Sequence, residues 1–218
     1  MIRLHKGQMP PILVANGNSW TSTLLEHINR GEEIPDQLGK SYNHPQIKTQ
    51  LEIETAGKCM YCEGRIKDLG YNHIEHYRPK DRRRYPQLTF EWANLGIACN
   101  VCNTNKGEEF DEAVPYINPY LEEPSSHFFA SGAFVFPKPG DARARLTELK
   151  VQLNRKGLVE SRGDALIRLN RLISEYHVEA TPSLKDVLRE QIWIECNRDK
   201  EFSFVLCAFA EFAGVPKT

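Results

Sequence analysis

The sequence contains no long apolar stretch and no marked excess of charge of either sign. Within its 218 residues no run of 18 apolar residues occurs, so no transmembrane helix is expected. Residues 1–13 mix cations with two prolines and lack the apolar segment of a secretory signal. A net charge of −1 gives no general sign of nucleic-acid binding, so any such binding must come from a local patch. Together these absences predict a cytoplasmic protein.

The composition is that of a folded chain, without internal repeats or low-complexity tracts. Hydrophobic residues make up 40% of the sequence and charged residues 26%, which is typical of a globular protein with a core. We divide the chain into an N-terminal helical segment (residues 1–57), a core rich in chemically active residues (58–111), an irregular covering segment (112–140) and a C-terminal helical region (141–218).

Local patterns predict an α+β fold. Asn43-His44-Pro45 is typical of a helix start, and Gly57 of a helix end. Residues 72–77 and 87–92 are predicted strands, the second because its apolar residues alternate, and a short helix should begin near Cys102 or Asn103. Further along we expect a hairpin through residues 128–136, helices starting near Ser161 and at Thr181-Pro182, and a buried helix over residues 202–212.

Four of the six cysteines form the pairs Cys59-x-x-Cys62 and Cys99-x-x-Cys102. Zinc prefers four tetrahedral ligands, and two such turns would supply four thiolates and leave no open position. The sequence therefore predicts a structural zinc site, with chance pairing or redox thiols as the alternative. Because 36 residues separate the two pairs, a folded unit must lie between them. Cys196 and Cys207 lie in apolar surroundings and are expected to be buried small hydrophobic residues.

The segment between and after the cysteine pairs carries Glu75-His76, Asn94 and Asn103. His76 can act as a general base, because an imidazole titrates near neutral pH. The side chain or backbone of Asn94 could hold the imidazole in place. Glu75 and Asn103 offer oxygen ligands, which suit Mg²⁺ or Mn²⁺. His73 is a weaker candidate, since on a strand it would face away from His76.

The loop after His76 holds the one concentrated basic patch of the chain. The loop contains five cations and one anion, Asp81, so its local charge is +4. The cations are Arg78, Lys80, Arg82, Arg83 and Arg84. Lys106, on the same short helix as Asn103, is expected to reach a phosphate. Such a loop is often only a solvent-exposed surface without a ligand. Its position beside the acid-His pair is what favours a nucleic-acid-binding role.

These motifs resemble the zinc-bearing branch of the HNH endonuclease family. The matching residues are Cys59-Met60-Tyr61-Cys62, Glu75-His76, Asn94-Leu95 and the run from Cys99 to Lys106. The resemblance implies a ββα-metal core with a structural four-cysteine zinc site in residues 58–111, surrounded by N- and C-terminal helices. It also implies that His76 is the general base, that Asn94 orients it, and that Glu75 and Asn103 bind the divalent ion. The family name would place histidine at position 103, where asparagine also offers an oxygen.

A further resemblance extends beyond this core, to the PtuB family of HNH effectors in Septu-type and retron-linked bacterial antiphage defence. The positions that carry it are Trp20, residues 57–63, 72–80 and 90–94, Leu153-Asn154-Arg155 and Arg162. It implies a PtuA-like ATPase partner and, for retron-linked members, a reverse transcriptase with its RNA–DNA hybrid. DNA is the favoured substrate. The alternatives are an effector that cleaves RNA, including transfer RNA, on the same core, and a non-catalytic zinc module that binds nucleic acid.

Overall fold

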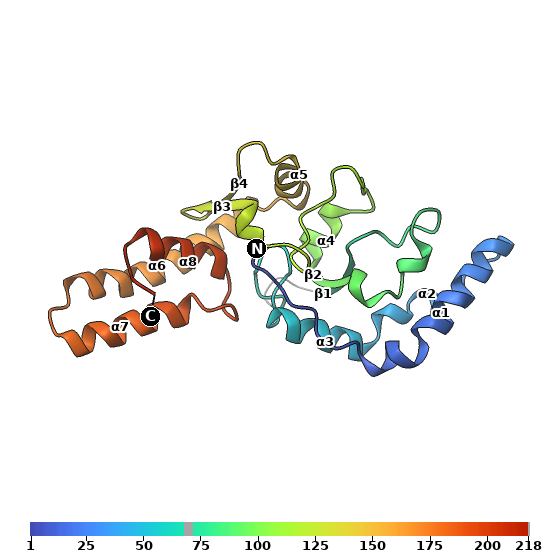
Figure 1. Cartoon of the computed structure of the whole chain (residues 1–218), viewed down its shortest axis with the longest axis horizontal. Helices are drawn as coiled ribbons and strands as arrows, with labels where there is room; N and C mark the ends of the chain where they lie inside the picture. Colours follow the sequence, from blue (N-terminus) through green and yellow to red (C-terminus); the bar gives the residue numbers. More distant parts are fainter. Residues whose placement is uncertain (68–71, 218) are drawn as a thin grey trace.

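The computed structural model describes residues 1–67 and 72–217. The elements run along an elongated molecule, with a small sheet at its centre and helices toward both ends (Figure 1). The α-helices are α1 (Pro11–Arg30), α2 (Asp36–Gly39), α3 (Pro45–Thr55), α4 (Asn100–Lys106), α5 (Ala142–Val151), α6 (Lys156–Val178), α7 (Pro182–Glu195) and α8 (Ser203–Phe212). The strands are β1 (Asn72–His76), β2 (Leu95–Cys99), β3 (Phe128–Ser131) and β4 (Phe134–Pro137), and the 3₁₀ turns are η1 (Ser41–Asn43), η2 (Pro86–Leu88), η3 (Trp92–Asn94) and η4 (Pro124–Ser126). The predicted α+β class is confirmed.

The helix before the first cysteine pair begins where the sequence predicts. His44 caps α3, since its side chain accepts a hydrogen bond from the backbone N–H of Gln46, and Pro45 occupies the first turn. The helix buries Ile47 and Leu51 completely. It ends at Thr55, and the left-handed φ of 70° at Gly57 turns the chain toward Cys59.

The central sheet pairs β1 with β2 in antiparallel register, so that His76 lies opposite Leu95. The first strand agrees with the prediction, but the predicted second strand at residues 87–92 is wrong. That segment forms the turns η2 and η3, and the strand follows after Asn94. The reason is that β2 is buried along its whole length, and a fully buried strand shows no alternation.

Helix α4 follows β2 directly and completes a ββα unit. It begins at Asn100, within a few residues of the predicted start, and Gly107 ends it with a positive φ of 64°. It packs against both strands of the sheet. Residues at the end of β1 and on α4 are thereby brought together.

The predicted hairpin, β3 with β4, lies in the covering segment, and the C-terminal region that follows it contains the helices α5 to α8. The predicted helix start at Ser161 is wrong, because α6 already begins at Lys156 and the Ser161 hydroxyl donates to the Gly157 carbonyl within the helix. Helix α8 is buried through Val205 and Leu206, but Phe212 is 88% exposed, so the expected burial of residues 202–212 holds only in part.

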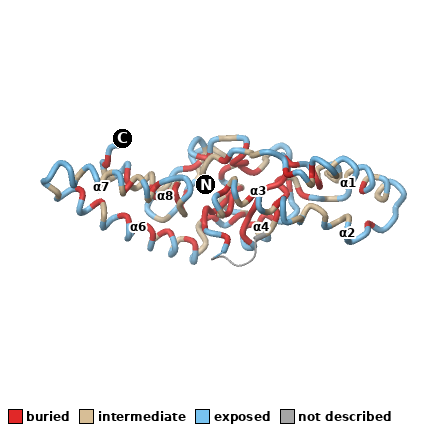
Figure 2. Tube along the Cα trace, turned by 90° about the horizontal axis from the view of Figure 1, so that it is seen from below, coloured by how far each residue is buried: buried red, intermediate tan, exposed pale blue. Residues whose placement is uncertain are grey.

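One continuous hydrophobic cluster runs from the N-terminal helices through the sheet to α8. Buried residues are densest around the central sheet (Figure 2). A second, smaller cluster contains Tyr77, Phe110 and Tyr116. Among the described residues, no helix combines the length and apolar character needed to cross a bilayer.

Candidate active site and metal centre

The four paired cysteines meet in the core of the ββα unit. Their sulfurs lie within 4.8 Å of one another and all four residues are buried. The Sγ atoms of Cys62 and Cys99 are 3.9 Å apart. In a zinc tetrathiolate with Zn–S bonds of about 2.3 Å, the sulfur–sulfur edge is about 3.8 Å. The cluster therefore fits zinc, as the sequence predicts, and a closed shell of four thiolates would leave a bound ion no open position.

The positions of the four cysteines connect the cluster to the neighbouring site that contains Asn103. Cys59 and Cys62 belong to a turn in which the Glu63 amide donates to the Cys59 carbonyl at 3.0 Å. Cys99 ends β2 and Cys102 lies in the first turn of α4. An ion held by all four residues would lock the junction between β2 and α4, and Asn103 follows directly on that helix.

His76 ends β1 and is 6% exposed. Its Nε2 lies 3.0 Å from the backbone carbonyl of Thr89. When Nε2 donates to this carbonyl, Nδ1 is the ring nitrogen that can accept a proton. Burial lowers the pKa of His76 to about 4, and the charges of Lys80 and Lys106 act in the same direction. The imidazole is therefore neutral at pH 7, which is the state a general base needs.

Asn94 contacts different atoms from those the sequence suggested. Its side-chain oxygen accepts from the Arg78 amide at 2.8 Å, and its side-chain nitrogen donates to the carbonyls of Arg78 and Leu88 at 2.9 and 3.1 Å. The Asn94 carbonyl accepts from the Tyr77 amide. The predicted direct contact with the imidazole is thus replaced by an indirect one: Asn94 ties together the two ends of the loop whose Thr89 carbonyl contacts His76.

Glu75 faces α4, where its Oε1 lies 2.7 Å from Nζ of Lys106. The Tyr61 hydroxyl donates to the same oxygen at 3.0 Å. Burial raises the pKa of Glu75, and the contacts with Lys106 and Tyr61 oppose that rise. The carboxylate, predicted to bind the divalent ion, has a cationic partner that the sequence did not reveal.

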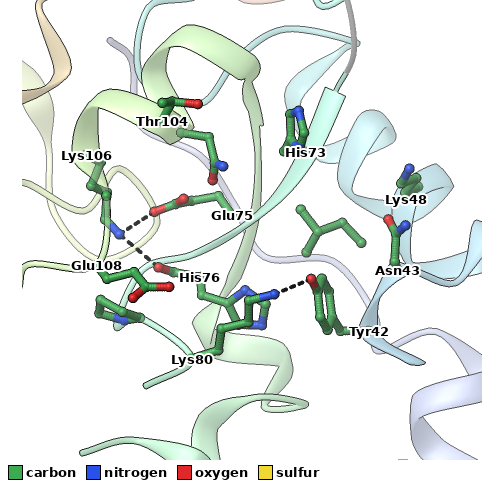
Figure 3. A pocket seen from close by; sticks show the side chains of 14 residues that line it. Tyr42, Asn43, Lys48, His73, Glu75, His76, Lys80, Thr104, Lys106 and Glu108 are labelled. Atoms are coloured by element: carbon green, nitrogen blue, oxygen red, sulfur yellow. Dashed lines mark hydrogen bonds and ion pairs between the residues drawn. The ribbon is translucent and has the colours of Figure 1, made fainter. Parts of the chain in front are cut away.

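Lys106, which the sequence predicts to reach a phosphate, is engaged within the protein by partners that the sequence did not reveal. Its side chain is 1% exposed, and besides Glu75 its ammonium donates to the His76 carbonyl at 2.9 Å. The physical reason is the position of Lys106 on α4, where the side chain points back at β1 rather than toward solvent (Figure 3).

A cavity of about 540 Å³ brings the predicted residues together (Figure 3). Glu75, His76 and Asn103 all line it, and the half-buried side chain of Asn103 has no protein hydrogen-bond partner among the described residues. His73 lines it too, near the start of β1 and away from His76 (Figure 3). The oxygen atoms of Glu75 and Asn103 are of the kind that Mg²⁺ or Mn²⁺ prefers.

Sequence reasoning missed two groups around His76. The Tyr42 ring packs against the imidazole edge to face, with centroids 4.7 Å apart. The other is the Thr89 carbonyl, which as a backbone atom has no side-chain signature. Tyr42 lies 34 positions before His76, too far along the chain for any local pattern to connect them.

The basic loop divides into cations with protein partners and cations without them. Arg78 binds Glu112 through two nitrogens, Lys80 donates to the Tyr42 hydroxyl, and Arg84 donates to the Phe110 carbonyl. The side chains of Arg82 and Arg83 are exposed and have no partner within the part of the chain that is described. They line a second cavity of about 510 Å³, which shares Lys80 and Glu108 with the first.

This geometry can be compared with known proteins. Residues 59–109 match the sequence model of the HNH endonuclease family. The matched HNH segment contains both cysteine pairs, Glu75, His76, Asn94 and Asn103. The predicted ββα core with its zinc-type cysteine cluster is therefore confirmed.

Two curated relatives extend the similarity beyond the HNH segment. Septu protein PtuB of Bacillus thuringiensis is 33% identical over 128 residues, which cover 58% of this chain and 45% of that protein. Septu protein PtuB of Bacillus mycoides (strain KBAB4) is 29% identical over 152 residues, with 56% of this chain and 52% of that protein covered. The chain thus spans about half the length of the curated relatives it matches, and the predicted resemblance to the PtuB group is confirmed over that part.

Proposed function

We propose that this chain is a metal-dependent HNH nuclease that hydrolyses phosphodiester bonds. The observation that carries the proposal is the state of His76: a neutral imidazole, held through Nε2 by a backbone carbonyl, in a cavity that also presents Glu75 and Asn103. The match of residues 59–109 to HNH endonucleases supports the same activity. A zinc module that only binds nucleic acid does not require a buried neutral imidazole beside two oxygen ligands.

In the proposed mechanism His76 accepts a proton from water at Nδ1, and the resulting hydroxide attacks phosphorus in line with the leaving 3′ oxygen. The Thr89 carbonyl keeps the imidazole in the required tautomer, and Asn94 fixes the loop that carries this carbonyl. Glu75 and Asn103 would hold the divalent ion, which when bound stabilises negative charge on the phosphate oxygens. Arg82 and Arg83 would position the backbone of the substrate. The products would carry a 5′ phosphate.

We further propose a role in antiphage defence, together with a PtuA-like ATPase that restrains or delivers the nuclease. The support is the similarity to two proteins named Septu protein PtuB. DNA is the first candidate substrate and transfer RNA the second; both present the phosphodiester that the proposed chemistry requires, and the sequence does not distinguish them. The names of these relatives do not mention a retron, so a reverse transcriptase partner stays a prediction from sequence resemblance.

The test is to incubate the purified chain, alone and with a PtuA-like ATPase, with plasmid DNA and with total transfer RNA, in Mg²⁺ and in EDTA. His76→Ala should lose at least about 100-fold in rate, because general-base catalysis contributes that much or more. His177→Ala, which changes an exposed histidine on α6, is the matched control. Cleavage by His76→Ala at the wild-type rate would disprove the assignment of the base. No cleavage in any lane by a folded, zinc-loaded protein would favour the binding module.

A further inference from the structure

Arg155, the residue before α6, contacts three of the four sulfurs of the cysteine cluster. Its Nη1 lies 3.5 Å from Sγ of Cys102, and its Nη2 lies 3.8 Å from Sγ of both Cys62 and Cys99. All three distances are within hydrogen-bonding range for a sulfur acceptor. The guanidinium thus joins the cluster from outside the HNH segment, which ends at residue 109.

The charge of a loaded cluster explains why a cation belongs there. Four thiolates around one Zn²⁺ carry a net charge of −2, and these cysteines are at most 1% exposed. A buried charge is costly unless it is paired and hydrogen-bonded. We propose that Arg155 is a working part of the zinc centre, where it donates hydrogen bonds to the thiolates and stabilises the bound ion. The proposal does not depend on the nuclease activity.

The residues next to Arg155 connect the zinc centre to the C-terminal region. Asn154 is hydrogen-bonded to the backbone of β4: its side chain accepts from the Val135 amide at 2.9 Å and donates to the Val135 carbonyl at 2.8 Å. The Leu153 carbonyl accepts from buried Arg162, on α6, at 2.8 Å. Arg155 is therefore held in place by the hairpin and by α6, so zinc retention depends on the docking of these elements against the HNH segment.

The test compares Arg155→Gln with wild type in the full chain loaded with zinc. The measurement is the apparent zinc affinity, obtained by competition with a chromogenic chelator of known affinity. Partners of metal ligands typically contribute about 10- to 100-fold in affinity, so a loss of that size is expected. Lys156→Gln is the matched control, since it removes one positive charge at the next position from a side chain that is 90% exposed. Its zinc affinity should equal that of wild type.

A spectroscopic measurement separates a direct effect on sulfur from a loss of fold. With Co²⁺ in place of zinc, removal of hydrogen bonds to the thiolates raises the electron density on sulfur, so the sulfur-to-cobalt charge-transfer band of Arg155→Gln should move to lower energy. The band of Lys156→Gln should not move. A lower affinity with an unmoved band would mean that Arg155 acts only through the fold, which would overturn the proposal.

Arg155→Lys keeps the test decisive if Arg155→Gln fails to fold. Lysine retains the charge, but its single ammonium cannot reproduce the planar set of donors that reaches three sulfurs. Weaker zinc binding than wild type is expected from this variant as well. Wild-type affinity in Arg155→Gln would show that the contacts contribute nothing to the metal centre. Wild-type affinity in Arg155→Lys would show that a positive charge alone suffices, which would overturn the hydrogen-bonding role.

Discussion

The buried imidazole of His76 should make the stability of the protein depend on pH between neutrality and about pH 4. An unperturbed histidine has a pKa near 6.5, whereas burial lowers the pKa of His76 to about 4 in the folded chain. Between these values the unfolded chain binds a proton that the folded chain excludes. The free energy of unfolding is therefore complete above the unfolded pKa and decreases as the pH falls toward the folded pKa. His76→Gln, which cannot titrate, should remove this contribution.

The size of the effect follows from the difference between the two pKa values. Each pH unit between them is worth about 1.4 kcal/mol, so lowering the pH from about 7.5 to about 5 should cost the wild type roughly 2 kcal/mol through His76 alone. The full contribution down to pH 4 would be about 3 kcal/mol. His76 is almost completely buried, so solvent screening should reduce these figures little.

The assay is urea denaturation of wild type and His76→Gln at about pH 7.5 and about pH 5. Other groups, including the cysteine cluster, also titrate as the pH falls, but they do so in both proteins and cancel in the comparison. The difference between the two pH dependences should be roughly 2 kcal/mol, with wild type the more sensitive. Equal pH dependences would refute the inference that His76 is held neutral by burial.

Two further predictions concern the partners around the site. Lys106→Met should lower the free energy of unfolding, measured by urea denaturation, by about 3–5 kcal/mol, because it leaves the buried Glu75 carboxylate unpaired. Adding Glu75→Gln to this variant should restore much of the lost stability. A cost below about 1 kcal/mol, as for an exposed pair, would contradict a buried ion pair. Tyr42→Ala should speed modification of His76 by diethyl pyrocarbonate, followed by mass spectrometry, because the ring that covers the imidazole is removed. Tyr42→Phe should leave that rate unchanged, and equal rates in all three proteins would show that Tyr42 does not shield His76.

The sequence alone was sufficient for those features that depend on residue type and short spacing. Two Cys-x-x-Cys turns predict a tetrahedral thiolate site wherever the chain brings them together, and the structure does bring them together. Likewise, Glu75-His76 and Asn103 could be selected because carboxylate, imidazole and amide groups have distinct chemistry. The start of α3 was predictable because a helix N-terminus depends only on His44, Pro45 and their immediate neighbours.

Tertiary structure decided everything that joins residues distant in sequence or uses backbone atoms. The second strand lies at Leu95–Cys99 because complete burial, rather than an alternating pattern, selects it. The hydrogen-bond partner of His76 is a backbone carbonyl, which every residue possesses, so no residue type in the sequence could predict this contact. The ion pair of Glu75 with Lys106 and the contact of Arg155 with the cysteine sulfurs form only when β1, α4 and the start of α6 pack together. Such contacts depend on three-dimensional proximity, which residue order along the chain does not specify locally.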